Sequence, residues 1–332
     1  MIMRTWKRWF TALVLLWVAD NVGRCDNEAR LTVATVDEQG TTVTDVSVAV
    51  TVFRPKDPLN PWAGLKEYYV EGSSNWNGEF CATAEEVSPF VGIGILKDGY
   101  YKSEADYEFT GRPVDGKWQP WNPTIPITLR QKVNPIPLYA RRWDSLDLPA
   151  LDTPIGYDLL VGDWVAPHGK GQISDFVLTF NRRYVLPTDC SSTFTLAMSG
   201  EYDGFVGIPD QDINRNSKLR FPREAPQSGY SIRSIIWSFD VGPGGGRAGA
   251  TCTVAEKHFF FRIRAATNQS GQVTSALYGK LVGPVEHDTY ATSGGIKLTY
   301  YVNPTPNDRS LEFALDQNLF TKLHYHDRPR EP

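Results

Sequence analysis

The chain has 332 residues with 34 basic and 38 acidic side chains, so its formal net charge is −4. This mildly acidic balance, with no basic stripe, argues against nucleic acid as a partner. Glycine, proline and aromatic residues are abundant while long helical periodicities are absent, so we predict an all-β fold of two antiparallel β-sandwiches.

The first 24 residues have the pattern of a secretory signal peptide. Arg4, Lys7 and Arg8 precede an apolar run at residues 9–19, which is too short to span a bilayer. We therefore expect residues 1–24 to be removed on export, to a secreted, periplasmic or cell-surface location. About 308 residues then remain, with 30 basic and 37 acidic side chains, a length that suits two domains.

Cysteine follows directly after this segment, in Val22-Gly23-Arg24-Cys25, which raises the question of a lipid anchor at Cys25. Lipidation signals need a small residue where Arg24 stands. We therefore expect an exported protein without a lipid anchor.

The four cysteines of the chain are Cys25, Cys81, Cys190 and Cys252. An even number in an exported chain, without C-x-x-C spacing, favours disulfides over metal thiolates. Three pairings are possible, and we prefer Cys25 with Cys81 and Cys190 with Cys252, since each pair then stays within one domain. The alternative is one bridge and two free buried thiols.

A strand pattern is clearest near the beginning of the expected mature chain. Val46, Val48, Val50 and Val52 alternate with small or polar residues, which is the period of a half-buried strand. Turn residues at 37–40 come just before this strand.

Five short segments occur in an order that resembles the carboxypeptidase regulatory-like domain, a transthyretin-like sandwich of about seven strands. They are residues 31–40, 43–53, 78–80, 91–100 and 125–129. The resemblance covers residues 29–131 and implies a structural or accessory module, because the domain in that family has no active site of its own.

Two tryptophans, Trp118 and Trp121, lie in a proline-rich insertion at residues 113–126. Indole faces in such a loop can stack on sugar rings, which makes both residues candidate ligand-binding residues. The alternative is that they cap the sandwich or pack against the second domain.

Proline is dense from residue 132 to residue 155, so we predict an extended connector there, docked on both domains by its interleaved apolar residues. Beyond it, residues 156–322 are predicted to form a larger, jelly-roll-like sandwich in which each strand buries one face. Five alternating strands carry this prediction, and a short last strand is expected at residues 311–313. The alternating residues are Phe176, Leu178 and Phe180; Phe194, Leu196 and Met198; Ile235, Trp237 and Phe239; Phe259, Phe261 and Ile263; and Ile296, Leu298, Tyr300 and Val302.

Four oxygen-bearing side chains, Asp210, Asp212, Asn214 and Asn216, stand at alternate positions as in the opening of a calcium loop. Arg215 occupies the place where such a loop needs glycine, so a polar loop of Asx turns is the preferred interpretation and calcium the alternative. His324, His326 and Asp327 could hold zinc or copper, but residues 323–332 are expected to be a solvated tail.

No spacing in the sequence indicates a zinc peptidase or selects a catalytic carboxylate pair. We therefore predict a non-enzymatic exported protein with a structural or surface-binding role in the cell envelope or outside the cell. The alternative is a carbohydrate-binding or glycan-active protein of the same compartment. The expected partners are accordingly a polysaccharide or a cell-envelope protein.

Overall fold

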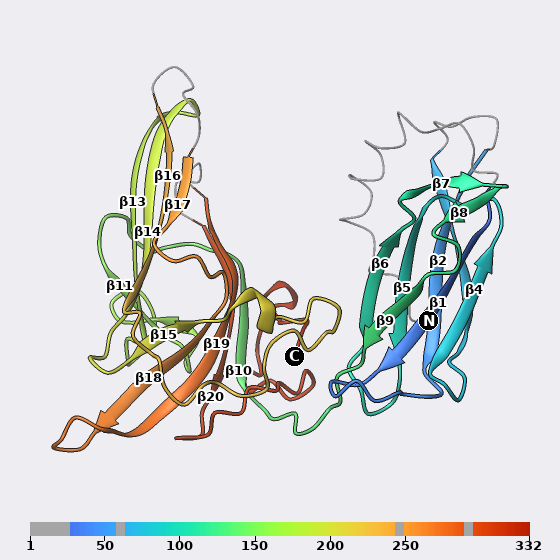
Figure 1. Ribbon diagram of the computed structural model, residues 1–332. Helices are drawn as coiled ribbons and strands as arrows, with labels where there is room; N and C mark the ends of the chain where they lie inside the picture. Colours follow the sequence, from blue (N-terminus) through green and yellow to red (C-terminus); the bar gives the residue numbers. More distant parts are fainter. Residues whose placement is uncertain (1–26, 58–63, 243–248, 289–294) are drawn as a thin grey trace. The chain divides into compact units, whose positions relative to one another are not determined.

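The computed structural model describes residues 27–57, 64–242, 249–288 and 295–332. The expected signal peptide and Cys25 lie outside these residues. The chain divides into two compact units, Met1–Lys132 with Arg215–Lys218, and Val133–Asn214 with Leu219–Pro332. Both units consist of β-sheets (Figure 1), which confirms the predicted all-β class. Over the described ranges, no helix has the length and apolar character needed to cross a membrane.

Seven strands of the first unit form two sheets, and β7 and β8 form a separate hairpin. The three-stranded sheet has the order β4 (Glu79–Ala84), β1 (Ala29–Val36), β9 (Thr124–Thr128). The four-stranded sheet has the order β3 (Leu65–Ser73), β2 (Ser47–Pro55), β5 (Phe90–Leu96), β6 (Ser103–Glu108). The hairpin joins β7 (Gly111–Val114) to β8 (Lys117–Gln119).

The core of the first unit follows from the alternation in the sequence. Val48, Val50 and Val52 on β2 are buried and belong to the same apolar cluster as Val33 on β1 and Ile93 on β5. Because successive side chains of a strand point to opposite faces, the valine pattern places one face of β2 in the core.

Two larger sheets make up the second unit. The five-stranded sheet has the order β10 (Tyr139–Leu146), β20 (Ile296–Asn303), β19 (Val273–His287), β18 (Phe259–Thr267), β15 (Gly204–Gly207). The six-stranded sheet has the order β12 (Asp163–Trp164), β11 (Ile155–Asp158), β13 (Phe176–Leu186), β14 (Asp189–Met198), β16 (Ser234–Val241), β17 (Gly249–Cys252). Every pairing in both sheets is antiparallel.

Aromatic side chains fill the space between these two sheets. The Phe176 ring centroid lies 5.2 Å from that of Phe261 and 5.6 Å from that of Phe205, so the two sheets meet through phenylalanines. All five of the predicted alternating strands are present, as β13, β14, β16, β18 and β20.

A second apolar cluster covers the other face of the five-stranded sheet. Loop residues Ile208, Phe221 and Phe313 pack there against Tyr278 of β19 and Tyr301 of β20. The prediction that each of the five alternating strands buries one face is therefore wrong for β18 and β20, whose Phe260 and Tyr301 are buried in this cluster. Long loops fold back over these strands and supply the second layer.

Part of the expected connector lies in a sheet, because residues 139–146 form β10 at the edge of the five-stranded sheet. The amide of Asn318 satisfies the open side of this strand, since its Oδ1 accepts from the Ala140 N–H at 3.3 Å and its Nδ2 donates to the Ala140 carbonyl at 2.7 Å. An edge strand tolerates nearby proline because one of its sides has no strand partner.

The C-terminal residues of the second unit are tied to its sheet at two points, while His324, Tyr325 and His326 are exposed as expected of a solvated tail. Asp327, in the 3-10 turn η3 (Tyr325–Asp327), pairs with Arg141 at 2.9 Å. The Tyr301 hydroxyl donates to the Glu331 carbonyl at 2.7 Å. The short strand expected at 311–313 is absent from the described residues, where Ser310 and Phe313 make only isolated bridges.

Cys190 and Cys252 are free thiols, so the predicted bridge between them is wrong. Cys190 pairs with Val241 and Cys252 with Trp237, which places β16 between them and offsets them by four positions along it. A disulfide needs Cα atoms about 4.4–6.8 Å apart, far less than this separation. Cys81 is an exposed free thiol on β4, and Cys25, its predicted partner, lies outside the described residues.

Candidate functional site

The predicted sugar-binding tryptophans have different surroundings. Trp118 on β8 packs against the core of the first unit, and its Nε1–H donates to the Val87 carbonyl at 2.9 Å. Trp121 is half-buried, with the Lys117 ammonium 4.8 Å from its ring centroid. The structure therefore supports the packing alternative for Trp118, and sugar binding at Trp121 stays a prediction.

The residues of the calcium hypothesis do not all belong to one unit. Asp210 and Asp212 lie on the 3-10 turn η2 (Asp210–Asp212) with exposed side chains, and Asn214 follows in the same unit. Asn216 belongs to the short segment that is grouped with the first unit. Calcium stays a prediction. In the described part of the chain, no three His, Cys, Asp or Glu side chains are placed to hold a metal ion.

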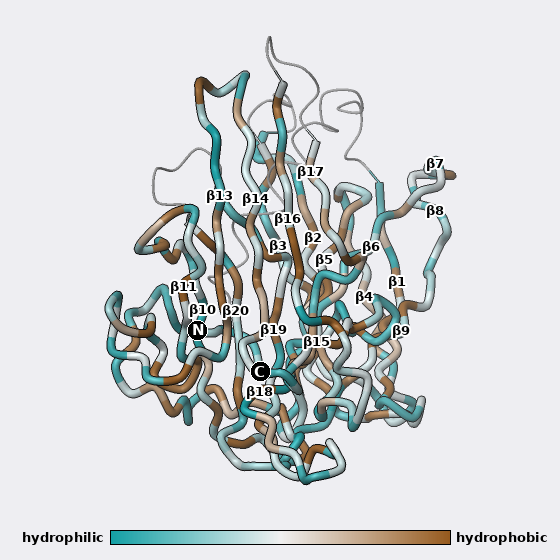
Figure 2. The backbone as a smooth tube through the Cα atoms, turned by 90° about the vertical axis from the view of Figure 1, so that its left-hand side faces the viewer, coloured by the Kyte–Doolittle hydropathy of each residue, from teal (hydrophilic) through white to brown (hydrophobic). Residues whose placement is uncertain are grey.

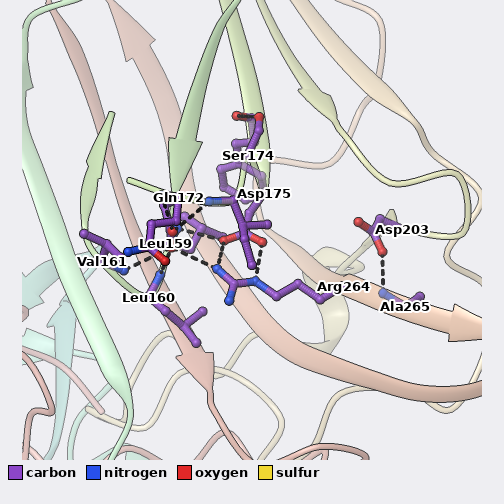
Figure 3. Close-up of polar contacts among 12 residues, drawn as sticks. Leu159, Leu160, Val161, Gln172, Ser174, Asp175, Asp203, Arg264 and Ala265 are labelled. Carbon is purple, nitrogen blue, oxygen red and sulfur yellow. Dashed lines mark hydrogen bonds and ion pairs between the residues drawn. The ribbon is translucent and has the colours of Figure 1, made fainter. Parts of the chain in front are cut away.

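A charge network in the second unit joins the Arg264 guanidinium to two buried aspartates (Figure 3). Arg264 lies on β18 where the pairing register shifts between Ile263 and Ala266, and it adopts a left-handed φ of 51°. A bulge of this kind redirects a side chain that regular alternation would point elsewhere. Here it brings the guanidinium to Asp158 and Asp175.

The guanidinium binds Asp175 with two hydrogen bonds and Asp158 with one. Arg264 Nε and Nη2 lie 2.8 Å from Oδ1 and Oδ2 of Asp175, and Nη2 also lies 2.8 Å from Oδ1 of Asp158. Both aspartates are at most 2% exposed. Such charge-assisted bonds are among the strongest in proteins, and breaking one partner leaves a buried charge uncompensated.

Asp158 also organises the loop that follows β11. Its Oδ1 accepts from the backbone N–H groups of Leu160 and Val161, and its Oδ2 accepts from those of Gln172 and Ile173. A single carboxylate thus fixes both ends of a loop that encloses β12. Without it, four backbone donors would lose their acceptor.

Asp203 completes the set drawn in Figure 3, because its Oδ1 accepts from the Ala265 N–H at 3.0 Å. Asp175 additionally accepts from the Leu159 N–H at 2.9 Å. Each oxygen of Asp158 and Asp175 therefore already accepts at least one hydrogen bond. The network therefore has a structural role, because it fixes the loop after β11 to Arg264 on β18.

The two aspartates differ in pKa. Burial raises the pKa of Asp175 despite its bonds to Arg264. Burial also acts to raise the pKa of Asp158, but the N–H groups of Gln172, Ile173 and Val161, with Arg264, hold it below its ordinary value. The hydrogen bond to Asp175 raises the pKa of Arg264, so the guanidinium stays charged. The network thus joins a fixed cation to carboxylates of unequal acidity.

A second arrangement joins the two sheets of this unit. Ser192 Oγ on β14 lies 3.1 Å from His287 Nε2 on β19, and the His287 ring centroid lies 5.6 Å from that of Phe180. A hydroxyl and an imidazole at this distance have nucleophile–base spacing. Ser192 is only 4% exposed, so the contact serves as a cross-sheet hydrogen bond.

Acidification is expected to weaken the second unit through His287. Burial lowers the pKa of His287 below its ordinary 6.5, so the unfolded chain takes up this proton at a higher pH than the folded chain. The stability that neutral His287 provides is present above pH 6.5 and is lost as the pH falls towards the folded pKa. Urea unfolding above and below pH 6.5 measures how the free energy of unfolding changes with pH. His287→Phe should make that change smaller. Equal slopes for parent and variant would contradict the prediction.

A fully buried lysine lies in the second apolar cluster. Lys280 on β19 is 0% exposed, and its Nζ donates to the Leu311 carbonyl at 2.9 Å. The ammonium lies 4.6 Å from the ring centroid of Tyr301, a cation–π distance. The residue after Leu311 is Glu312, and its carboxylate accepts from the N–H groups of Val133 and Asn134, each at 3.0 Å. These contacts tie the start of the unit and a late loop to the sheet.

None of these three arrangements was predicted from the sequence. Arg264 is 106 positions from Asp158, and His287 is 95 positions from Ser192. No short motif connects residues so far apart. A buried lysine within an otherwise apolar strand, as in Tyr278-Gly279-Lys280-Leu281-Val282, is the one local signal the sequence offered.

Comparisons with known proteins assign no family to the chain. No family model and no curated protein matches it. Among solved structures, it is similar over 32% of its length to 57% of a hydroxyquinol 1,2-dioxygenase from Pseudomonas putida, with 13% identity and a TM-score of 0.22. It is also similar over 86% of its length to 84% of the major pilin SpaD from Corynebacterium diphtheriae, with 8% identity and a TM-score of 0.25.

The shaft pilin SpaA from Lactobacillus rhamnosus GG gives comparable values. A variant of that pilin is 9% identical and has a TM-score of 0.22, with 86% of this chain and 94% of the pilin covered. The chain spans a little over half of the dioxygenase's length. At TM-scores this low, none of these likenesses supports a functional assignment.

Proposed function

We propose that this chain is an exported, non-enzymatic protein with a structural or surface-binding role in the cell envelope or outside the cell. The observation that carries the proposal is that charged side chains inside the second unit hold its loops in place. Arg264, Lys280 and Glu312 each bind the backbone or side chains of loop segments that are distant in the sequence. This use of charge suits a module whose task is to keep a fixed shape.

Arg264 and its aspartates hold the ends of the loop after β11, and Lys280 with Glu312 holds the start of the unit and the loop around Leu311. Buried ionic groups cost desolvation energy, which these hydrogen bonds offset when their geometry is good. The gain is a defined position for segments that have no strand partners of their own.

The first unit supports the same function through its architecture. Its seven strands in sheets of three and four match the strand number expected of a carboxypeptidase regulatory-like sandwich. We therefore propose that the first unit is a transthyretin-like accessory module. Both units would then act through their surfaces.

Export is tested by locating the chain in a bacterial host and measuring the mass of its N-terminal peptide. We expect a processed chain outside the cytoplasm, because residues 9–19 supply the apolar segment of a signal peptide. Substituting Leu15→Arg and Leu16→Arg together interrupts that segment and should leave the unprocessed chain in the cytoplasm.

The purified processed chain provides the second half of the test. Catalytic turnover of a polysaccharide or any other substrate would contradict the non-enzymatic role. Cytoplasmic location of the parent chain, equal to that of the double variant, would contradict export.

A further inference from the structure

The hairpin formed by β13 and β14 ends in a run of exposed apolar residues. Tyr184, Val185 and Leu186 are 40%, 60% and 44% exposed, and in the described part of the chain they are the only large exposed hydrophobic residues that are consecutive. Isolated exposed hydrophobic residues are common on protein surfaces, whereas a contiguous group often marks a contact site. We call residues 182–189 the hairpin tip.

The hairpin tip projects at one end of the second unit. Only Pro187 and Thr188 separate β13 from β14. Within this unit the turn lies at the opposite end from the β18–β19 hairpin (Figure 1), and the tube is brown where β13 reaches the turn (Figure 2). The register of β13 against β14 shifts between Tyr184 and Leu186, so Val185 is an extra, bulged residue and regular alternation does not hold at the tip. The site is thus the projecting end of a hairpin, with a bulge in its exposed apolar run.

Charge at the hairpin tip differs from that of the whole chain. Arg182 and Arg183 directly precede the apolar run, and Asp189 is the one acidic residue of the tip, which leaves a formal charge of +1 in a chain of −4. The Arg182 guanidinium lies 4.5 Å from the Tyr184 ring centroid, and Arg183 pairs with Asp189. An apolar end with arginines just behind it complements an anionic surface that has an apolar interior.

We propose that the hairpin tip inserts into the interface of an anionic lipid bilayer. Val185 and Leu186 enter the boundary between headgroups and acyl chains, Tyr184 lies at headgroup level, and Arg182 faces lipid phosphates while Arg183 stays paired with Asp189. At about 3.3 Å per residue the three apolar residues reach roughly 10 Å, the depth at which interfacial segments are buried. A projecting hairpin end needs a partner that deforms around it, which favours lipid over the rigid surface of a folded protein.

Vesicle flotation of the purified processed chain tests the proposal independently of export. The probes are vesicles of phosphatidylcholine alone and of phosphatidylcholine mixed with phosphatidylglycerol. We expect the chain to float with the anionic vesicles, less so at high salt, and to bind neutral vesicles weakly. Val185→Asp with Leu186→Asp should lower the bound fraction by roughly 10-fold or more, since charge at the interface opposes insertion.

A matched control uses another exposed hairpin. Val114 on β7 is 56% exposed, so Val114→Asp adds one negative charge elsewhere, half of that added by the double variant, and should leave binding unchanged. Arg182→Gln with Arg183→Gln should weaken binding to anionic vesicles only, and the Tm of each variant shows that it is folded. The proposal is overturned if the parent chain does not bind, if the Val114 variant loses as much binding as the tip variant, or if the tip instead mediates dimers that Val185→Asp dissociates.

Discussion

Replacing Arg264 with methionine is expected to lower the free energy of unfolding of the second unit by about 3–5 kcal/mol. The substitution removes the partner of two buried carboxylates, Asp158 and Asp175, which are held at 2.8 Å in the parent chain. Methionine retains most of the aliphatic volume of arginine. The decrease in the free energy of unfolding therefore comes mainly from the loss of the charged guanidinium. Urea unfolding at neutral pH, followed by tryptophan fluorescence, gives the value.

An exposed ion pair in the same unit provides the control. Lys297 and Glu286 lie 3.5 Å apart with both side chains more than half exposed. Lys297→Met should therefore change the free energy of unfolding by no more than about 1 kcal/mol. Equal losses for the two variants would show that the burial of the Arg264 network adds nothing to stability.

Phe261→Ala is expected to cost about 3–5 kcal/mol of unfolding free energy. Phe261 on β18 is fully buried, and its ring centroid lies 5.2 Å from that of Phe176 on the facing sheet. Truncation leaves a cavity between two sheets whose backbones are fixed by hydrogen bonds, so the space cannot fully collapse. Urea unfolding measures this loss as well.

Tyr202→Ala serves as the comparison, because that aromatic side chain is 37% exposed and its loss opens no enclosed cavity. We expect a change well below that of Phe261→Ala. A loss under about 1 kcal/mol for Phe261→Ala would mean that the inter-sheet layer packs loosely.

Strand alternation was predictable because it depends on neighbours in the sequence. Phe194, Leu196 and Met198 recur with a period of two, and the same period puts all three inside the second sandwich. Proline density was less informative, since residues 139–146 form an edge strand whose open side is satisfied by Asn318. A local rule about proline does not anticipate a side chain that arrives from elsewhere in the chain.

The cysteine prediction was wrong for a related reason. Placing Cys190 and Cys252 in one domain was correct, but membership of a domain does not bring two residues together. The distance between the two cysteines depends on the pairing register of β14, β16 and β17. The number of residues between the cysteines does not determine that register.

The sequence by itself determined that the chain folds as β-strands and which side chain of each alternating pair lies inside, because water exclusion acts on every strand separately. Only the tertiary structure decided which loops cover the outer face of β19 and β20, and which carboxylates meet Arg264. Those contacts join segments that are up to about 100 residues apart, and their distances are fixed only when both sheets have formed.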